Sequence, residues 1–191
     1  MCDELLTHFR KYIQIDDGDE HDILSFFSIT DLRKKQNILV EGKVCRTNLF
    51  VVKGCLRLYF INENGTEQTT QFAIENWWMT DYTAFHSRQP STFNIQAVEQ
   101  SKVITIDLDS QEILLERFPQ FERYFRLIFQ RATAASQLRI RYLYELSHEE
   151  LYNQFRNLYP GFVQRIPQYL LASFLGFSPE YLSEIRKRSI S

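Results

Sequence analysis

The sequence predicts an α+β protein in which an N-terminal antiparallel β-roll, or double-stranded β-helix, is joined by a long helix to a C-terminal all-α part. Three observations lead to this fold class. Short runs with strand character fill residues 31–107, an unbroken helical run fills 119–146, and helical spacing returns after residue 147. We therefore place the domain limits at 1–117, 118–146 and 147–191.

The composition of the 191 residues allows two small domains with a substantial core, because 44% are hydrophobic and 15% aromatic. A net charge of −2 argues against a protein that coats nucleic acid, although it leaves room for a local basic patch. The polar N-terminus carries no secretory signal and no apolar run is long enough to span a membrane, so no membrane partner is expected. Three widely spaced cysteines fit a reducing cytoplasm, which is the expected location.

Two short amphipathic helices are predicted before the roll, over residues 3–13 and Asp19–Phe27. The roll is predicted from six apolar or alternating runs that are bounded by turn residues. These runs are Asn37–Val40, Asn48–Val52, Leu56–Ile61, Thr69–Ile74, Thr92–Val98 and Lys102–Ile106. Between the third and fourth runs, Asn64-Gly65 predicts a hairpin in which both central residues have positive φ.

One segment, from Glu75 to His86, breaks the strand alternation. Thr80 or Asp81 is expected to cap a short helix there, with backbone N–H groups pointing outward. A polar loop over residues 87–92 then leads back into a strand. A short helix inside a β-roll is unusual, and this one is predicted to form an anion site.

The long helix, from Pro119 to Leu146, contains no internal Pro or Gly and reads as about 28 residues of continuous helix. One row of it steps by four and three residues, the heptad spacing of a helix that pairs with another helix. We interpret this row as a dimer seam made by Phe121, Phe125, Ile128, Ala132, Ala135, Arg139, Tyr142 and Leu146. A second row is expected to pack on the chain's own core and holds Leu127, Ala134 and Leu138. The alternative is a single core helix of one domain.

The C-terminal part begins with Ser147-His148-Glu149-Glu150, which has the form of a capping box. The helix that follows is expected to end at Tyr159-Pro160-Gly161. Residues 166–188 then have the spacing of a helix-turn-helix, in which Gly176 supplies the left-handed turn and Ser178 the N-cap of the second helix. That second helix ends in Arg186-Lys187-Arg188 and is the predicted recognition helix.

The order of these parts resembles the Crp/Fnr family of bacterial transcription regulators. In the roll the resemblance rests on Val40-Glu41-Gly42, Phe50–Arg57 and the hairpin Asn62–Glu67. In the tail it rests on Ile166-Pro167-Gln168, Ala172, Leu175-Gly176, Ser178-Pro179-Glu180 and Ile185. The resemblance implies a homodimeric DNA-binding regulator with a cyclic-nucleotide-binding-like sensor domain. Its implied partners are double-stranded DNA, a second copy of the chain, a small-molecule effector of unknown identity and RNA polymerase.

The sequence departs from the family's phosphate-binding cassette, which carries Gly-Glu near its start and Arg-Ser or Arg-Thr near its end. Here Asp81 stands near the place of the carboxylate, Gln89-Pro90 stands where the arginine is expected, and Arg88 lies close by in the sequence. Because an Arg–phosphate pair is a strong bidentate contact, cAMP is not expected to bind in the usual way. The candidate effector residues are Trp78, Asp81, Tyr82, Arg88, Ser91 and Thr92.

The predicted recognition helix also departs from the family pattern. It begins Ser178-Pro179-Glu180, without the arginine that relatives often carry, and Glu184 occupies a position where they often carry another. Because the sequence ends at Ser191, the family's β-wing is expected to be reduced or absent. The candidate DNA contacts are Gln168, Ser178, Glu180, Tyr181, Ser183, Arg186, Lys187 and Arg188.

Two alternative functions remain open at this stage. One is a sensor or adaptor protein of the same fold that has lost DNA binding, which the acidic Glu180 and Glu184 favour. The other is a β-roll enzyme that holds a metal through clustered histidines and carboxylates. The four histidines lie in four separate segments, so we expect no enzyme, no catalytic residues, no metal and no resident cofactor.

Overall fold

The computed structural model describes residues 3–188, so Cys2 and the chain end at Ser191 lie outside the described residues. The chain divides into two compact units. Unit 1 holds the residues up to Phe60 together with Gln71–Gln130, and unit 2 holds Ile61–Thr70 together with the residues from Arg131 on. This division differs from the predicted limits at 117 and 146, because the first half of the long helix packs into the core of unit 1.

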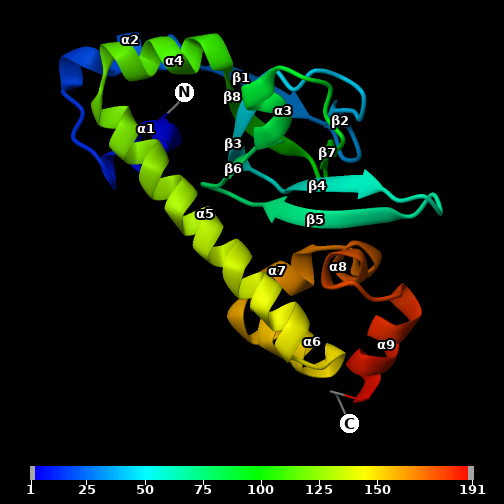
Figure 1. Cartoon of the computed structure of the whole chain (residues 1–191). Coiled ribbons are helices and arrows are strands. Elements are labelled where there is room, and N and C mark those ends of the chain that lie inside the picture. The colour runs from blue at the N-terminus through cyan, green and yellow to red at the C-terminus, as the bar shows by residue number, and fades with distance from the viewer. Residues whose placement is uncertain (1–2, 189–191) are drawn as a thin grey trace. The chain divides into compact units, whose positions relative to one another are not determined.

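The predicted α+β fold is confirmed: an antiparallel β-roll is followed by a long helix and further helices (Figure 1). The roll contains two four-stranded sheets, with strand orders β1-β8-β3-β6 and β2-β7-β4-β5. The strands are β1 (Ser28–Leu32), β2 (Asn37–Leu39), β3 (Thr47–Lys53), β4 (Leu56–Ile61), β5 (Glu67–Ala73), β6 (Trp78–Met79), β7 (Asn94–Ala97) and β8 (Ser101–Asp107). The sequence analysis missed β1 and the two-residue β6, which pairs with Leu49 and Phe50 of β3.

The hairpin between β4 and β5 forms as predicted, but its turn type was wrong. Among the described residues of the turn, only Gly65 has positive φ. The Asn62 side-chain oxygen accepts from the backbone N–H groups of Asn64 and Thr66, and the Asn62 carbonyl accepts from the Gly65 N–H. These bonds close a longer turn in which Asn64 keeps a negative φ.

Unit 1 contains several helices besides the sheets. They are α1 (Asp3–Arg10), η1 (Asp17–Asp19), α2 (Glu20–Leu24), α3 (Tyr82–Ser87), α4 (Leu108–Arg117) and the first half of α5 (Gln120–Glu145). The sequence analysis did not predict α4, which starts directly at the end of β8. Its N-cap is Asp107, whose carboxylate accepts from the Ser110 N–H at 2.8 Å.

Strand β3 separates two hydrophobic cores, because alternate residues of a strand face opposite sides. Leu49 and Val51 belong to the core between the sheets, whereas Phe50 belongs to a second core with α1, α4 and α5. Phe121 and Phe125 lie in that second core, with exposures of 0% and 4%. These two residues were therefore wrongly assigned to a dimer seam, since they already pack inside their own chain.

Unit 2 contains α6 (His148–Leu158), α7 (Pro160–Arg165), α8 (Gln168–Leu175) and α9 (Pro179–Arg188). The predicted capping box forms, because the side chains of Ser147 and Glu150 each bond the other residue's backbone N–H. Pro160 ends α6 as expected, but it also opens α7, a helix the sequence analysis did not anticipate. Pro suits this position because its missing N–H is not needed in a first helical turn.

Two further contacts stabilise unit 2. The guanidinium of Arg139 donates to the Phe174 carbonyl at 2.7 Å and lies 4.2 Å from the centre of that ring. Burial lowers the pKa of Arg139, and this residue was also wrongly assigned to the seam. The Ser173 hydroxyl donates to the Glu67 carbonyl at 2.8 Å and accepts from the Thr69 N–H at 2.9 Å, so it joins α8 to the hairpin segment of unit 2.

Candidate functional site

The short helix α3 is closed at its N-terminus by its own cap. One oxygen of Asp81 accepts from the N–H groups of Thr83 and Ala84, at 3.1 and 3.2 Å. The other oxygen accepts from the Ser91 hydroxyl at 2.7 Å, and both Asp81 and Ser91 are buried. The cap predicted at Thr80 or Asp81 is therefore Asp81. The two N–H groups assigned to an anion site are already bonded to it.

Arg88 and Thr92 lie at the end of this cassette segment, and both are exposed. Arg88 is the C-cap of α3, in the left-handed conformation at φ 57°. Its guanidinium forms an ion pair with Asp109 in the first turn of α4. The structure therefore directs Arg88 to α4 and does not bring it together with the Asp81–Ser91 pair.

Trp78 is a core residue that links β6 to α5. Its indole N–H donates to the Tyr124 hydroxyl at 2.7 Å, and the His8 Nδ1 lies 2.8 Å from the same hydroxyl. Burial raises the pKa of Tyr124, and the hydrogen bond from Trp78 offsets part of that rise. Because an indole can only donate, the Tyr124 hydrogen is left for His8. Sequence spacing could not indicate a bond between residues 8 and 124.

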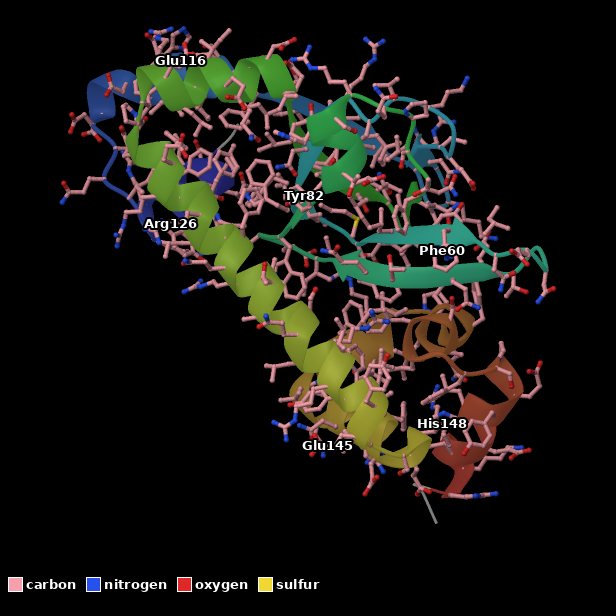
Figure 2. All side chains as sticks on the ribbon, in the orientation of Figure 1. Phe60, Tyr82, Glu116, Arg126, Glu145 and His148 are labelled. Atoms are coloured by element: carbon pink, nitrogen blue, oxygen red, sulfur yellow. The ribbon has the colours of Figure 1, made fainter. Side chains whose placement is uncertain are left out.

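Tyr82 is the first residue of α3 (Figure 2), and it packs against α5. Its ring packs edge-on against Phe129 of α5, with centroids 5.1 Å apart, and 38% of the residue remains exposed. Burial raises the pKa of its hydroxyl, and the nearby Asn48 side chain offsets part of that rise. Asn48 is fully buried, and the sequence analysis missed it. In the sequence, Asn48 is marked only by being an amide side chain among the apolar residues of β3.

The α8–α9 pair has the local geometry predicted for a helix-turn-helix. Gly176 ends α8 at φ 82°, and the Ser178 hydroxyl accepts from the Tyr181 N–H at 3.2 Å. Leu182 and Ile185 are buried, so α9 has one fixed inner face. Of the candidate DNA contacts, Gln168 lies in α8, Ser178 directly precedes α9, and the others lie in α9. They are exposed at Gln168, Ser178, Glu180, Tyr181, Lys187 and Arg188 and half-buried at Ser183 and Arg186.

The second half of α5 exposes apolar side chains that the sequence analysis assigned differently. Ala134 and Leu138 were expected to pack on the chain's own core, yet both are exposed. Of the predicted seam, Ile128 and Tyr142 are half-buried and only Ala132 and Ala135 are exposed. Four large side chains stand out on this half of the helix: Leu138 at 50%, Ile140 at 54%, Leu143 at 42% and Tyr144 at 89% exposure.

Within residues 3–188, His, Cys, Asp and Glu nowhere form a group of three or more that could hold a metal ion. In the same part of the chain, no helix combines the length and the apolar character needed to cross a membrane.

One known family of domains resembles the roll in sequence. The sequence model for the cyclic nucleotide-binding domain matches residues 29–118, which covers all of the roll after its first residue and extends through α4. The search of curated proteins finds no relative of the sequence. The match covers 90 of the 191 residues, so the roll together with α4 is similar in sequence to cyclic nucleotide-binding domains.

Solved structures resemble this chain over most of its length. FixK2 from Bradyrhizobium japonicum is 15% identical, with 85% of this chain and 83% of that chain covered and a TM-score of 0.70. The c-di-GMP responsive global regulator CLP of Xanthomonas campestris is 14% identical, with 91% of each chain covered and a TM-score of 0.69. The catabolite activator protein of Thermus thermophilus is 18% identical, with 91% and 83% covered and a TM-score of 0.56. At these identities the likeness establishes the fold.

Proposed function

We propose that this protein is a dimeric DNA-binding transcription regulator of the Crp/Fnr type, with α9 as its recognition helix. The observation that carries the proposal is the exposed face of α9. Two buried residues, Leu182 and Ile185, anchor the helix, and its last turn carries Arg186, Lys187 and Arg188. A short helix held from one side and basic at one end fits the major groove of DNA.

The exposed residues of α9 divide into two roles in this proposal. Arg186, Lys187 and Arg188 contact phosphate groups, which supply affinity without sequence information. Glu180 and Ser183 face base edges, where a carboxylate accepts from the amino group of cytosine. Gln168, at the start of α8, contacts the backbone beside the groove.

Dimerisation is the second part of the proposal. Two recognition helices in successive major grooves bind far more tightly than one, and a pair of α5 helices is the natural link between them. The pairing surface that we propose is the exposed apolar row with Ala134 and Leu138, together with the predicted seam residues Ala132 and Ala135, which are exposed as well. Small and aliphatic side chains at this spacing allow two helices to approach closely.

The effector of the roll is proposed to differ from cAMP held in the usual way. Arg88 is paired with Asp109, and Asp81 is used as a helix cap, so neither is available for the phosphate or the ribose of a cyclic nucleotide without rearrangement. RNA polymerase remains an expected partner from the resemblance, and a cytoplasmic location is expected with it.

A second candidate, an adaptor without DNA binding, is favoured by one observation. Glu180 and Glu184 lie on the exposed face of α9, where carboxylates repel phosphates. An adaptor is expected to show no sequence preference among DNA duplexes at physiological salt.

DNA binding can be tested by selecting duplexes from a random pool with the purified full chain and measuring affinity at several salt concentrations. We expect a selected two-fold-symmetric site. Each of Arg186→Ala and Lys187→Ala should lower the slope of log K against log salt by about two, one phosphate contact per protomer. The matched control, Lys53→Ala, changes an exposed lysine of the roll and should leave the slope unchanged. Failure to select any sequence, from a chain that is dimeric, would support the adaptor.

A further inference from the structure

The buried histidine of α1 belongs to a chain of hydrogen bonds that crosses unit 1. His8 is 4% exposed, and its Nδ1 lies 2.8 Å from the Tyr124 hydroxyl of α5. The same hydroxyl accepts from the Trp78 indole of β6 at 2.7 Å. Of these three side chains, only the histidine can gain a proton near neutral pH. Its protonation state therefore bears on a contact that joins three elements.

The two neighbours of His8 in this chain fix which of its nitrogens carries hydrogen. Because an indole can only donate, the Tyr124 hydroxyl accepts from Trp78 and keeps its own hydrogen to donate. Within the described residues, the structure places no other hydrogen-bond acceptor at that hydroxyl than the His8 Nδ1. A hydrogen on Nδ1 would leave the buried Tyr124 hydrogen without a partner, which is unfavourable. His8 is therefore neutral, with its hydrogen on Nε2.

The surroundings of the His8 ring do not favour a positive charge. The ring contacts Tyr12, Phe50 and Tyr124, with centroids 5.2, 5.1 and 5.7 Å away. The two tyrosines are the titratable groups among these contacts, and both are neutral near pH 7. The charged residues of the packed elements are exposed: Asp3, Glu4 and Arg10 of α1, Lys11 after it, Lys53 of β3, and Glu122, Arg123 and Arg126 in the first half of α5. An imidazolium at this place would therefore be costly.

Helix α1 covers part of the first half of α5. Leu5 and Phe9 of α1 have an exposure of 0%. The Phe9 ring lies edge-on to the rings of Phe121 and Tyr124, with both centroids 4.8 Å away. A change at the bond between His8 and Tyr124 therefore acts directly on the contact between α1 and α5.

We propose that His8 is a pH-sensitive switch that holds α1 on α5 while it is neutral and releases α1 when it is protonated. Protonation turns Nδ1 into a donor, so the Tyr124 hydrogen loses its acceptor and a charge is placed in the core. Both costs are relieved when the histidine reaches water. Because an ordinary imidazole gains its proton near pH 6.5, the released form should gain population below that pH. The switch does not depend on DNA binding by α9, since all of its residues belong to unit 1.

Amide hydrogen exchange of the full chain, followed by NMR, measures the release of α1. The Tyr12 and Ile13 N–H groups donate to the Phe9 carbonyl, at 2.9 and 3.1 Å, and report on this helix end. After correction for intrinsic exchange rates, their protection should fall about ten-fold between pH 7.5 and pH 5.5. Unchanged protection over this interval would overturn the proposal.

A matched pair of variants assigns the effect to His8. His8→Asn places an acceptor oxygen near the position of Nδ1 but does not titrate, so its protection should change by less than about two-fold over the same interval. His21→Asn makes the same change at the exposed histidine of α2 and should keep the ten-fold fall. An equal fall in His8→Asn and wild type would overturn the proposal.

A measurement on wild type alone covers the case in which His8→Asn fails to fold. Nitrogen NMR of the full chain at pH 7.5 distinguishes a ring nitrogen that carries hydrogen from one that does not. The His8 signals should show hydrogen on Nε2 and none on Nδ1. Hydrogen on Nδ1 at this pH would contradict the switch, because Tyr124 would then have no acceptor to lose.

Discussion

Single buried residues of unit 1 join elements that are far apart in the sequence. Tyr124 is fully buried and receives a hydrogen bond from Trp78, while its hydroxyl also contacts His8. Each of these three residues comes from a different element, and none of the partners is near another in the sequence. The sequence could indicate that Trp78 and Tyr124 are core residues, but it could not indicate that one hydroxyl joins them.

The ionisation of Tyr124 gives the first prediction. Burial raises its pKa above the ordinary value of 10.0, so above that pH the unfolded chain loses the proton and the folded chain keeps it. The free energy of unfolding should then fall with rising pH, by about 1.4 kcal/mol per pH unit from this residue. Urea unfolding of wild type and Tyr124→Phe between neutral and alkaline pH measures the difference. Tyr144→Phe, at an exposed site, is the control and should keep the wild-type slope.

Gly54 gives the second prediction, because no other residue fits its place. It has φ 106°, and a Cβ there would lie 2.2 Å from the Ser101 hydroxyl oxygen and 2.6 Å from the Ser101 Cα. Gly54→Ala combines backbone strain with a clash against backbone, and should lower the free energy of unfolding by about 2–4 kcal/mol. Gly42→Ala has similar strain at φ 81° but meets no described atom within 4 Å, and should cost about half as much or less. Urea unfolding measures both variants, and equal decreases in the free energy of unfolding would contradict this account.

Elements were predicted best where glycine, proline or a cap marks their ends. Gly176, Ser178 and the Ser147 capping box each form as expected, because these residues act on the backbone beside them. Helix α4 was missed because it follows β8 with no turn residue between them. The seam was misassigned because heptad spacing shows that one face of α5 is buried, without showing whether the chain itself or a second copy covers it.

The contact between α8 and β5 gives the third prediction. Ser173→Ala removes the hydroxyl that bonds the Glu67 carbonyl and the Thr69 N–H. Since a lost hydrogen bond to an edge strand is worth about 1 kcal/mol, the Thr69 amide should exchange its hydrogen several-fold faster. Amide exchange followed by NMR measures this directly. Ser136→Ala, on the exposed part of α5, should leave the exchange rate of the Thr69 amide unchanged. An equal increase of that rate in Ser136→Ala would contradict the role of Ser173.

At the scale of the whole molecule, the fold class was predictable and the division into units was not. The order of roll, long helix and terminal helices follows from a change of periodicity at two points in the sequence. The assignment of Ile61–Thr70 to unit 2 depends on contacts over more than one hundred residues, such as Thr69 with Ser173. Candidate effector residues were chosen by their position in the family motif, and the structure uses Asp81, Arg88 and Trp78 for bonds within the chain.

Self-association is the prediction that belongs to this scale. Leu138→Glu places a charge in the exposed apolar row of α5 and should raise the dimer dissociation constant by at least about ten-fold. Because Leu138 is half exposed in the single chain, the monomer should remain folded. Sedimentation equilibrium measures the constant, and Gln137→Glu, one residue away on another face, is the control. A wild-type chain that stays monomeric at micromolar concentration would rule out the dimer.

The hairpin segment has a practical consequence for anyone who divides this protein. The chain passes between the two units after Phe60, after Thr70 and after Gln130, so cutting at Gln130 leaves the hairpin segment on the roll without α8. The Glu67 carbonyl and Thr69 N–H then become an open strand edge, which invites pairing with another chain. A roll prepared without its helical tail should therefore self-associate through β5, and a dimer observed in such a fragment would say nothing about α5.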